Sequence, residues 1–208
     1  MAMIVIVDYG MGNLESLRSK LERLKHEARV TADKDLILAA GKIILPGVGH
    51  FTAGMANIRA RGLVDVLDRK VLQEKTPVLG ICLGMQLLTG YSEEGHVDGL
   101  GWVAARTVRL DLPADTPERF RVPHMGWNKV IPRKESLLFR DIPPGERFYF
   151  AHSYHVVCRN PEDIAAGTPY GPEFVAAFEK GNIYGVQFHP EKSHASGLKL
   201  LDNFLRYA

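Results

Sequence analysis

A cysteine at position 82 stands where a reactive side chain is expected, in Gly80-Ile81-Cys82-Leu83-Gly84. The apolar run at 76–79 predicts a short buried strand, and 85–88 predicts a helix. Cys82 therefore falls on a sharp strand-to-helix turn, where glycine tolerates unusual backbone angles and leaves room for a substrate. Unpaired N–H groups at the start of the helix would favour its thiolate. We interpret Cys82 as a candidate nucleophile.

A base and an orienting group follow near the end of the chain, in Phe188-His189-Pro190-Glu191. The run at 184–188 predicts a strand that delivers His189 at its end, and Pro190 biases His189 toward extended backbone. Residues two apart in an extended segment point the same way, so we expect Glu191 to reach the imidazole and hold one tautomer. Together with Cys82 these residues predict a nucleophile–base–orienter arrangement.

A third requirement is a set of donors for a developing oxyanion. The apolar run at 43–45 predicts a strand that leads into Pro46-Gly47-Val48-Gly49. Backbone N–H groups near Val48 and Gly49, with that of Leu83, are candidates for this role. Gln86 lies one helical turn after Cys82 on the same face.

Each motif alone has an ordinary interpretation. The cysteine is explained as a small core residue, the histidine as a loop residue, and the glycines as a turn. The three motifs together point to one mechanism, because each follows a predicted strand and open α/β sheets gather their sites at the carboxyl ends of strands.

The chain resembles the class I glutamine amidotransferases, and more narrowly the glutaminase subunits of imidazole glycerol phosphate synthase. The Gly80–Leu88 turn and His-Pro-Glu are shared with the wider class. The segments that carry the resemblance are 8–13, 46–51, 80–88, 123–128 and 189–193. The resemblance implies a cysteine thioester mechanism that hydrolyses L-glutamine.

The resemblance also assigns roles to individual residues. It implies that Cys82, His189 and Glu191 form the catalytic triad. It implies a substrate-binding group and, separately, residues near a partner interface or gate. The first group comprises Gln86 (holding the substrate), Glu94 (its α-amino group) and His152, Ser153 and Tyr154 (its carboxylate end), and the second comprises Asn13, Trp127, Tyr149 and Lys192.

A partner is expected on independent grounds. A phosphosugar-converting (β/α)8 barrel needs about 250 residues, and a chain of 208 residues has no room for one beside its own domain. The resemblance implies a heterodimer in which a cyclase subunit with such a barrel receives ammonia through a channel, as a step of histidine biosynthesis.

Composition narrows the function classes. The 208 residues predict one domain over 1–208, with 46% hydrophobic and 24% charged residues. A net charge of +2 gives no broad attraction to nucleic acid or membrane. Two cysteines and no secretory signal predict a cytoplasmic location with free thiols, and Cys158 is expected to be a core thiol.

Neither a cofactor nor a metal is expected. Gly10 and Gly12 follow the first predicted strand, but Glu15 stands where a dinucleotide-binding loop needs its third glycine. His152 and His155 lie three apart on one predicted strand, so they are expected to face opposite sides and make a poor metal pair.

The order of the elements predicts an α/β fold, a mostly parallel sheet flanked by helices with antiparallel additions, of the flavodoxin-like kind that the class I amidotransferases adopt. Expected strands are 3–9, 42–45, 102–110, 148–158, 174–178 and 183–188; expected helices are 14–24, 51–61, 64–74 and 196–207; 111–121 is an expected surface loop.

Two other functions stay open at this stage. One is another class I amidotransferase that serves a different acceptor. The second is a cysteine hydrolase, or a non-catalytic relative, on the same fold.

Overall fold

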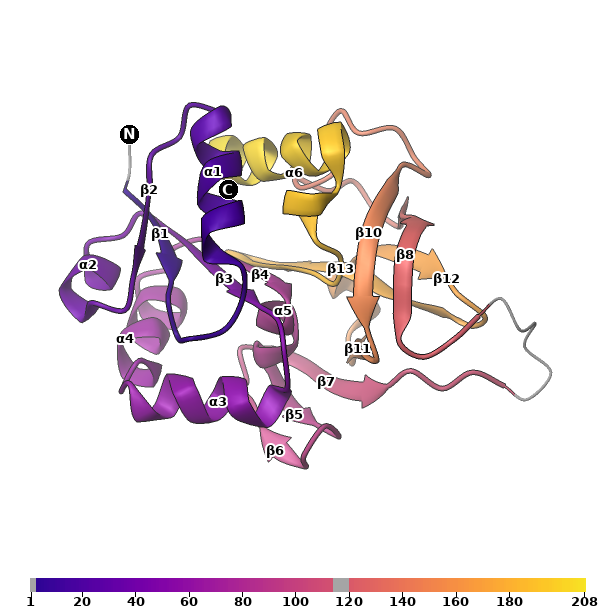
Figure 1. Cartoon of the computed structure of the whole chain (residues 1–208), viewed down its shortest axis with the longest axis horizontal. Helices are drawn as coiled ribbons and strands as arrows, with labels where there is room; N and C mark the ends of the chain where they lie inside the picture. Colours follow the sequence, from indigo (N-terminus) through magenta and orange to yellow (C-terminus); the bar gives the residue numbers. More distant parts are fainter. Residues whose placement is uncertain (1–2, 114–119) are drawn as a thin grey trace.

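Five parallel strands form the centre of the molecule in the computed structural model of the chain, which describes residues 3–113 and 120–208 (Figure 1). The register is continuous across them, and Gly47 lies opposite Cys82 on the neighbouring strand. Their order in the sheet is β2 (Ala28–Thr31), β1 (Ile4–Val7), β3 (Lys42–Gly47), β4 (Val78–Cys82) and β14 (Ile183–Val186).

Antiparallel strands extend this sheet beyond β14. The sequence prediction of a parallel sheet with antiparallel additions is therefore confirmed. The additions are β13 (Glu173–Lys180), β11 (Tyr154–Cys158) and β7 (Val103–Arg109), then β5 (Thr89–Ser92), which runs parallel to β7, and β6 (Val97–Asp98), with β12 (Ile164–Pro169) and β9 (Ile131–Pro132) branching from β13.

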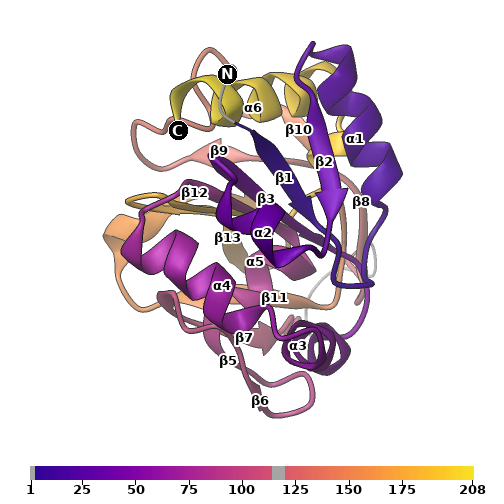
Figure 2. The ribbon, with the colours of Figure 1, turned by 90° about the vertical axis from the view of Figure 1, so that its left-hand side faces the viewer.

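Helices cover both faces of the parallel strands (Figures 1 and 2). The strand residues alternate: Ile4 and Ile6 belong to one hydrophobic cluster, and Val5 and Val7 belong to the other. The first cluster packs against α1 (Leu14–Arg23) and α6 (His194–Tyr207); the second packs against α2 (Lys34–Leu38), α3 (Phe51–Ala60) and α4 (Val64–Asp68), which continues as a π-helical turn over Arg69–Gln73.

A separate two-stranded antiparallel sheet stands beside this core. It pairs β8 (His124–Lys129) with β10 (Arg147–His152), and Phe148 and Phe150 of β10 are fully buried in the cluster that also holds Phe188. We call this pair the second sheet.

The single strand predicted over 148–158 is wrong. The chain leaves β10 at His152 and begins β11 at Tyr154, so the segment contributes to two different sheets with Ser153 between them. No glycine or proline marks the break, and aromatic or β-branched residues stand on both sides of it. Because the two halves pair with different partners, only tertiary packing decides where the strand divides.

Other departures are smaller. The strand expected over 76–79 extends to Cys82, and several short or polar segments (28–31, 34–38, 89–98, 124–129 and 164–169) form elements that were not predicted. Of the loop predicted at 111–121, residues 111–113 and 120–121 contain no helix or strand, and 114–119 lie outside the described residues. Within the described ranges no helix has both the length and the apolar character needed to cross a bilayer.

Candidate active site

Cys82 occupies a constrained turn at the end of β4. It caps α5 (Leu83–Leu87) with φ 53° and ψ −111°, a left-handed conformation that is uncommon for a residue with a side chain. The helix packs directly on the backbone of β3, so closely that a Cβ atom built on Gly84 would lie 1.7 Å from the carbonyl oxygen of Leu45. The backbone therefore fixes the Cα atom of Cys82 at the carboxyl end of the parallel strands.

His189 and Glu191 lie next to this turn. Strand β14 pairs with β4 in parallel register and ends at Val186, two residues before the predicted end at 188, and the chain then continues to His189 at the same edge of the sheet. The Nδ1 atom of His189 is 2.9 Å from Oε1 of Glu191, and both residues are buried. The predicted contact between His189 and Glu191 is present. The predicted extended backbone is not, because Pro190–Lys192 form a 3-10 turn.

The pKa of His189 is set by opposing influences. Burial alone lowers it, but hydrogen bonds to Cys82 and Glu191, together with the charges of these partners, outweigh burial and raise the pKa to about 10. The imidazolium form is thus favoured beside the sulfur. Cys158 differs, because burial raises the pKa of its thiol to about 12. Its side chain is half-buried, so it is more exposed than the core thiol predicted from the sequence.

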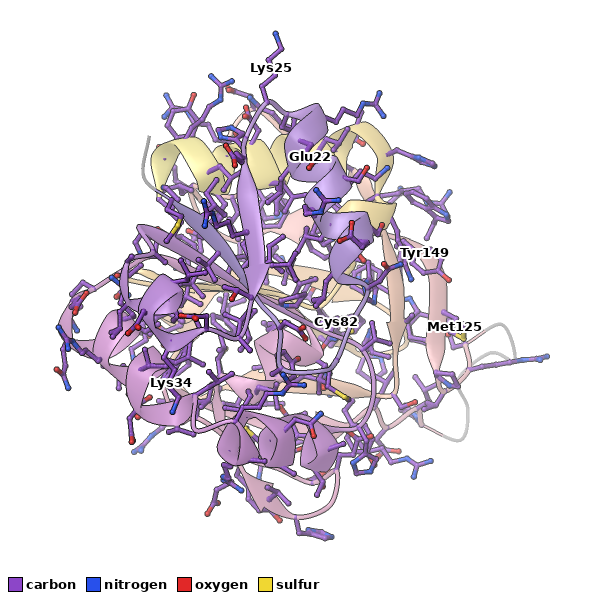
Figure 3. All side chains as sticks on the ribbon, turned by 60° about the vertical axis from the view of Figure 1, so that its left-hand side comes forward. Glu22, Lys25, Lys34, Cys82, Met125 and Tyr149 are labelled. Carbon is purple, nitrogen blue, oxygen red and sulfur yellow. The ribbon has the colours of Figure 1, made fainter. Side chains whose placement is uncertain are left out.

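A cavity of about 320 Å³ opens beside Cys82. It brings together, with the cysteine, all eight residues predicted to bind substrate or oxyanion. Figure 3 shows Cys82 near the centre of the molecule and Met125 nearer its edge, on the second sheet. The lining comprises Val48, Gly49, Cys82, Leu83, Gln86, Glu94, Pro123, Met125, Ala151, His152, Ser153 and Tyr154.

Two polar side chains in this cavity are held by the protein. Gln86 donates from Nε2 to the carbonyl of Tyr154 at 2.9 Å and to Oε1 of Gln187 at 3.1 Å. In the described part of the chain both of its amide hydrogens have acceptors, so its carbonyl oxygen is the atom left for a ligand. Glu94 accepts from the backbone N–H of Phe51 at 2.7 Å, which places a carboxylate at the start of α3.

The loop at 46–49 is hydrogen-bonded to the core at Pro46 and exposed to solvent at Val48. Tyr9 donates its hydroxyl proton to the carbonyl of Pro46 at 2.6 Å. Gly49 has φ +126°, and a Cβ there would lie 2.5 Å from the Met11 methyl carbon. Val48 is 50% exposed. The positive φ therefore favours glycine at position 49, and Val48 and Gly49 both line the cavity.

A sequence profile described as "Glutamine amidotransferase class-I" matches residues 5–208. The chain belongs to the class I glutamine amidotransferase family. Imidazole glycerol phosphate synthase subunit HisH 2 of Methanococcus maripaludis is 50% identical over 206 residues, covering 99% of this chain and all of that protein. HisH 2 of Pseudomonas aeruginosa is 46% identical, covering 98% of each chain. A HisH of Moorella thermoacetica is 48% identical, covering 97% of this chain and 93% of that one.

Solved structures agree on the fold of this amidotransferase. The chain matches a structure titled "Structure of PurLQS from Thermotoga maritima" with a TM-score of 0.73 and 21% identity, covering 100% of this chain and 99% of the other. A "putative gmp synthase subunit a protein" from Thermoplasma acidophilum matches with a TM-score of 0.71 and 20% identity, covering 99% and 92%. The relatives named HisH are described as subunits of imidazole glycerol phosphate synthase.

The predicted interface residues of the amidotransferase come from four segments near the triad: β8, β10, the 3-10 turn at 190–192 and the start of α1. Trp127 stacks on His194 with ring centroids 4.7 Å apart and meets Tyr149 edge-on at 6.1 Å. The Nζ atom of Lys192 lies 5.6 Å from the centre of the Tyr149 ring. Asn13 caps α1 and lines a small cleft with His189 and Glu191. Trp127 is 36% exposed, so it offers apolar surface outside the core.

Several residues of the amidotransferase site were missed from the sequence. Pro123, Met125 and Ala151 line the cavity because the second sheet closes over it, and that sheet was not predicted. Gln187 is fully buried, and its Nε2 atom lies 3.8 Å from the sulfur of Cys82. A signal for Gln187 did exist in the sequence. The other residues of the run 183–188 are aliphatic, aromatic or glycine, and Gln187 alone has an amide side chain.

The premise used for His152 and His155 was also wrong, since the two residues lie on different strands. The closest nitrogen partner of His152 is Nδ1 of His124, at 3.1 Å. Among the residues that the structure describes, no three His, Cys, Asp or Glu side chains are grouped so that they could hold a metal ion.

Proposed function

We infer that this chain is the glutaminase subunit of an imidazole glycerol phosphate synthase and releases ammonia from L-glutamine. The observation that carries this inference is the convergence of Cys82, His189 and Glu191 at the strand ends, in a chain that is 50% identical over its whole length to a HisH subunit. The roles of individual residues below are parts of the proposal.

Glutamine enters the cavity with its side-chain carboxamide over Cys82. The sulfur attacks the carboxamide carbon as a thiolate, and His189 holds the proton as imidazolium. Glu191, hydrogen-bonded to Nδ1, fixes the tautomer so that Nε2 faces the sulfur. A tetrahedral adduct forms, with negative charge on the former carbonyl oxygen.

Backbone N–H groups near Val48 and Gly49, with that of Leu83, stabilise this oxyanion. The N–H of Leu83 belongs to the first turn of α5, where backbone donors have no partner within the helix. His189 then gives its proton to the departing nitrogen, which leaves as ammonia. Water, deprotonated by His189, hydrolyses the thioester to glutamate and restores the cysteine.

The remaining cavity groups orient the amino acid. The free carbonyl oxygen of Gln86 and the carboxylate of Glu94 accept hydrogen bonds, which suits the α-ammonium group of glutamine. His152, Ser153 and Tyr154, at the break between β10 and β11, contact the carboxylate end of the substrate.

We propose a cyclase subunit with a (β/α)8 barrel as the partner, in a heterodimer through which ammonia passes. The surface of Asn13, Trp127, Tyr149 and Lys192 borders the triad and carries an exposed indole, which suits a contact with a second protein. Neither nucleic acid nor membrane is a proposed partner. A cytoplasmic location stays a prediction from the sequence.

Glutamine turnover tests the function directly. Glutamate formation is measured for the isolated chain, for the chain with the cyclase subunit, and for the complex with the cyclase ligand present. We expect turnover in the complex, with ammonia incorporated into the cyclase product. An active complex that releases all its ammonia to solution would contradict the synthase assignment while keeping the glutaminase.

The two alternative functions give different results. If the chain serves another acceptor, a different synthase co-purifies with it and the cyclase does not. If it is a general cysteine hydrolase or a non-catalytic relative, the complex fails to hydrolyse glutamine. A glutamine-analogue alkylator followed by peptide mass spectrometry should modify Cys82 and spare Cys158.

A further inference from the structure

We propose that Gln187 is a positioning residue for the nucleophile: its side-chain N–H donates to the sulfur of Cys82 and favours the thiolate. This inference rests on the proposed function, since it takes Cys82 to be the nucleophile. Gln187 has no exposed surface, and its Nε2 atom lies 3.8 Å from Sγ. Val186, the last residue of β14, pairs with Ile81 in parallel register, and the residues that follow the two are Gln187 and Cys82.

The direction of the Gln187 amide is fixed by a chain of hydrogen bonds. The backbone carbonyl of Tyr154 can only accept, so it takes one N–H of Gln86, at 2.9 Å. The second N–H of Gln86 then faces the oxygen of Gln187, at 3.1 Å. Gln187 must therefore turn its own NH₂ group toward the sulfur. A flipped amide would place two NH₂ groups or two oxygens against each other.

The donor has a defined competitor at the sulfur. The carbonyl oxygen of Ala151 lies 4.0 Å from Sγ and would accept the proton of a neutral thiol. An N–H donor acts in the opposite sense, because it can bond a thiolate but gains nothing from a thiol proton. The titratable neighbours coupled to the sulfur are His189 and Tyr9, and Tyr9 stays neutral because burial raises the pKa of its hydroxyl. Gln187 adds an uncharged donor to this group.

The arrangement also connects substrate binding with the nucleophile. Gln86 lines the cavity and offers its free carbonyl oxygen to a ligand, while its NH₂ group holds Gln187. A glutamine bound to the carbonyl oxygen of Gln86 therefore restrains the side-chain amide of Gln187, which contacts the sulfur of Cys82. The backbone of Gln187 is itself fixed, because its N–H donates to the carbonyl of Ala176 at 2.8 Å.

Two variants separate the donor from the packing of Gln187. Q187E keeps an oxygen that can accept from Gln86 but loses the N–H that faces the sulfur. Q187M keeps the size of the side chain and removes both hydrogen bonds. The matched control is T89V, which removes a buried hydroxyl that donates to the backbone carbonyl of Gln86 at 2.8 Å without touching Cys82.

The measurement is the rate of iodoacetamide alkylation at Cys82, followed by peptide mass spectrometry as a function of pH in the complex with the cyclase subunit. We expect the midpoint of the rate profile to rise by about one pH unit in Q187M, and by more in Q187E. Below the midpoint this is about a tenfold slower reaction. T89V should keep the midpoint of the unmutated chain.

A second readout needs no variant. In the unmutated chain the ¹⁵N resonance of the Gln187 side-chain amide should titrate with the same midpoint as the alkylation rate. Unchanged midpoints in both Gln187 variants would overturn the proposal, and so would an amide resonance that ignores the titration if the variants do not fold. Failure of the proposed function is distinct, because it appears as an unmutated complex that does not turn over glutamine.

Discussion

The ends of the parallel strands and the second sheet make different contributions to one site. The parallel strands deliver Cys82 and His189 from a rigid, fully buried core, and the backbone around the sulfur has no spare volume. The second sheet supplies walls and rim, including Met125, which is 64% exposed, and Trp127. The comparison separates the two tasks: the sheet ends fix the reacting groups, and the added strands shape what they meet.

Removal of the nucleophile is the strongest test of this division. In the complex, C82A should lower glutaminase activity by about 10³-fold or more, because no other group can form the thioester. Binding of the cyclase subunit should persist, since Cys82 is buried and is not among the proposed interface residues. C158A is the control and should keep its activity. Loss of partner binding in C82A would show that the two regions do not act separately.

The orienting carboxylate comes next. E191Q keeps the shape of the side chain but removes the charge that raises the pKa of His189 and can present an N–H to the ring. We expect kcat of the complex to fall by about 10²- to 10⁴-fold with little change in KM. A variant that changes KM alone would place Glu191 in substrate binding and not in the triad.

The second sheet should be the acid-sensitive part of the molecule. Burial lowers the pKa of His124 to about 4 and that of His152 to about 3, and it also lowers the pKa of His155. The folded chain therefore stays neutral at these rings while the unfolded chain binds protons below about pH 6.5. Stability should fall as pH drops from about 6.5 toward 4, by up to about 1.4 kcal/mol per pH unit for each histidine.

Denaturant unfolding at several pH values measures this dependence. H124N should flatten the slope of unfolding free energy against pH in that window, because one of the neutral rings is removed. Hydrogen exchange at low pH should rise first in β8 and β10. Uniform exchange across β4 and β8 would remove the difference between the two regions.

The smallest expected effect lies at the base of the loop at 46–49. Y9F removes the buried hydroxyl that donates to the Pro46 carbonyl, so the unfolding free energy should fall by about 1–2 kcal/mol. Y207F is the matched control, because that tyrosine is exposed and its ring can still pack against Arg140. Equal stabilities of the two variants would mean that Tyr9 does not clamp the loop.

The sequence revealed the reacting groups more readily than the walls around them. Glycine spacing and apolar runs mark the turn at Cys82 and the strand before His189, because the backbone conformation of each depends on the residue types within it. The contact of Glu191 with His189 is present, but it arises in a 3-10 turn. No glycine or proline marks the break at Ser153, which follows from the pairing of the two halves with different sheets.

Gln187 was hidden for a related reason. Nothing in an apolar strand says which neighbour a buried amide will meet, and the answer depends on the register between β14 and β4. The extent of the domain over 1–208 and the roles assigned to single residues stay predictions. The fold class and the family were within reach of the sequence because they rest on motifs spread along the whole chain.

The contact of Gly84 with the Leu45 carbonyl carries a consequence for control of the enzyme. A helix packed directly on the strand backbone cannot tilt or slide without a collision, so the backbone of Cys82 stays in place. Any switch between a slow and a fast hydrolase must then be made by moving its surroundings toward it, through the peptide groups after Pro46 or the paired strands above the pocket. A partner that binds those segments would control the rate of hydrolysis without contacting the cysteine.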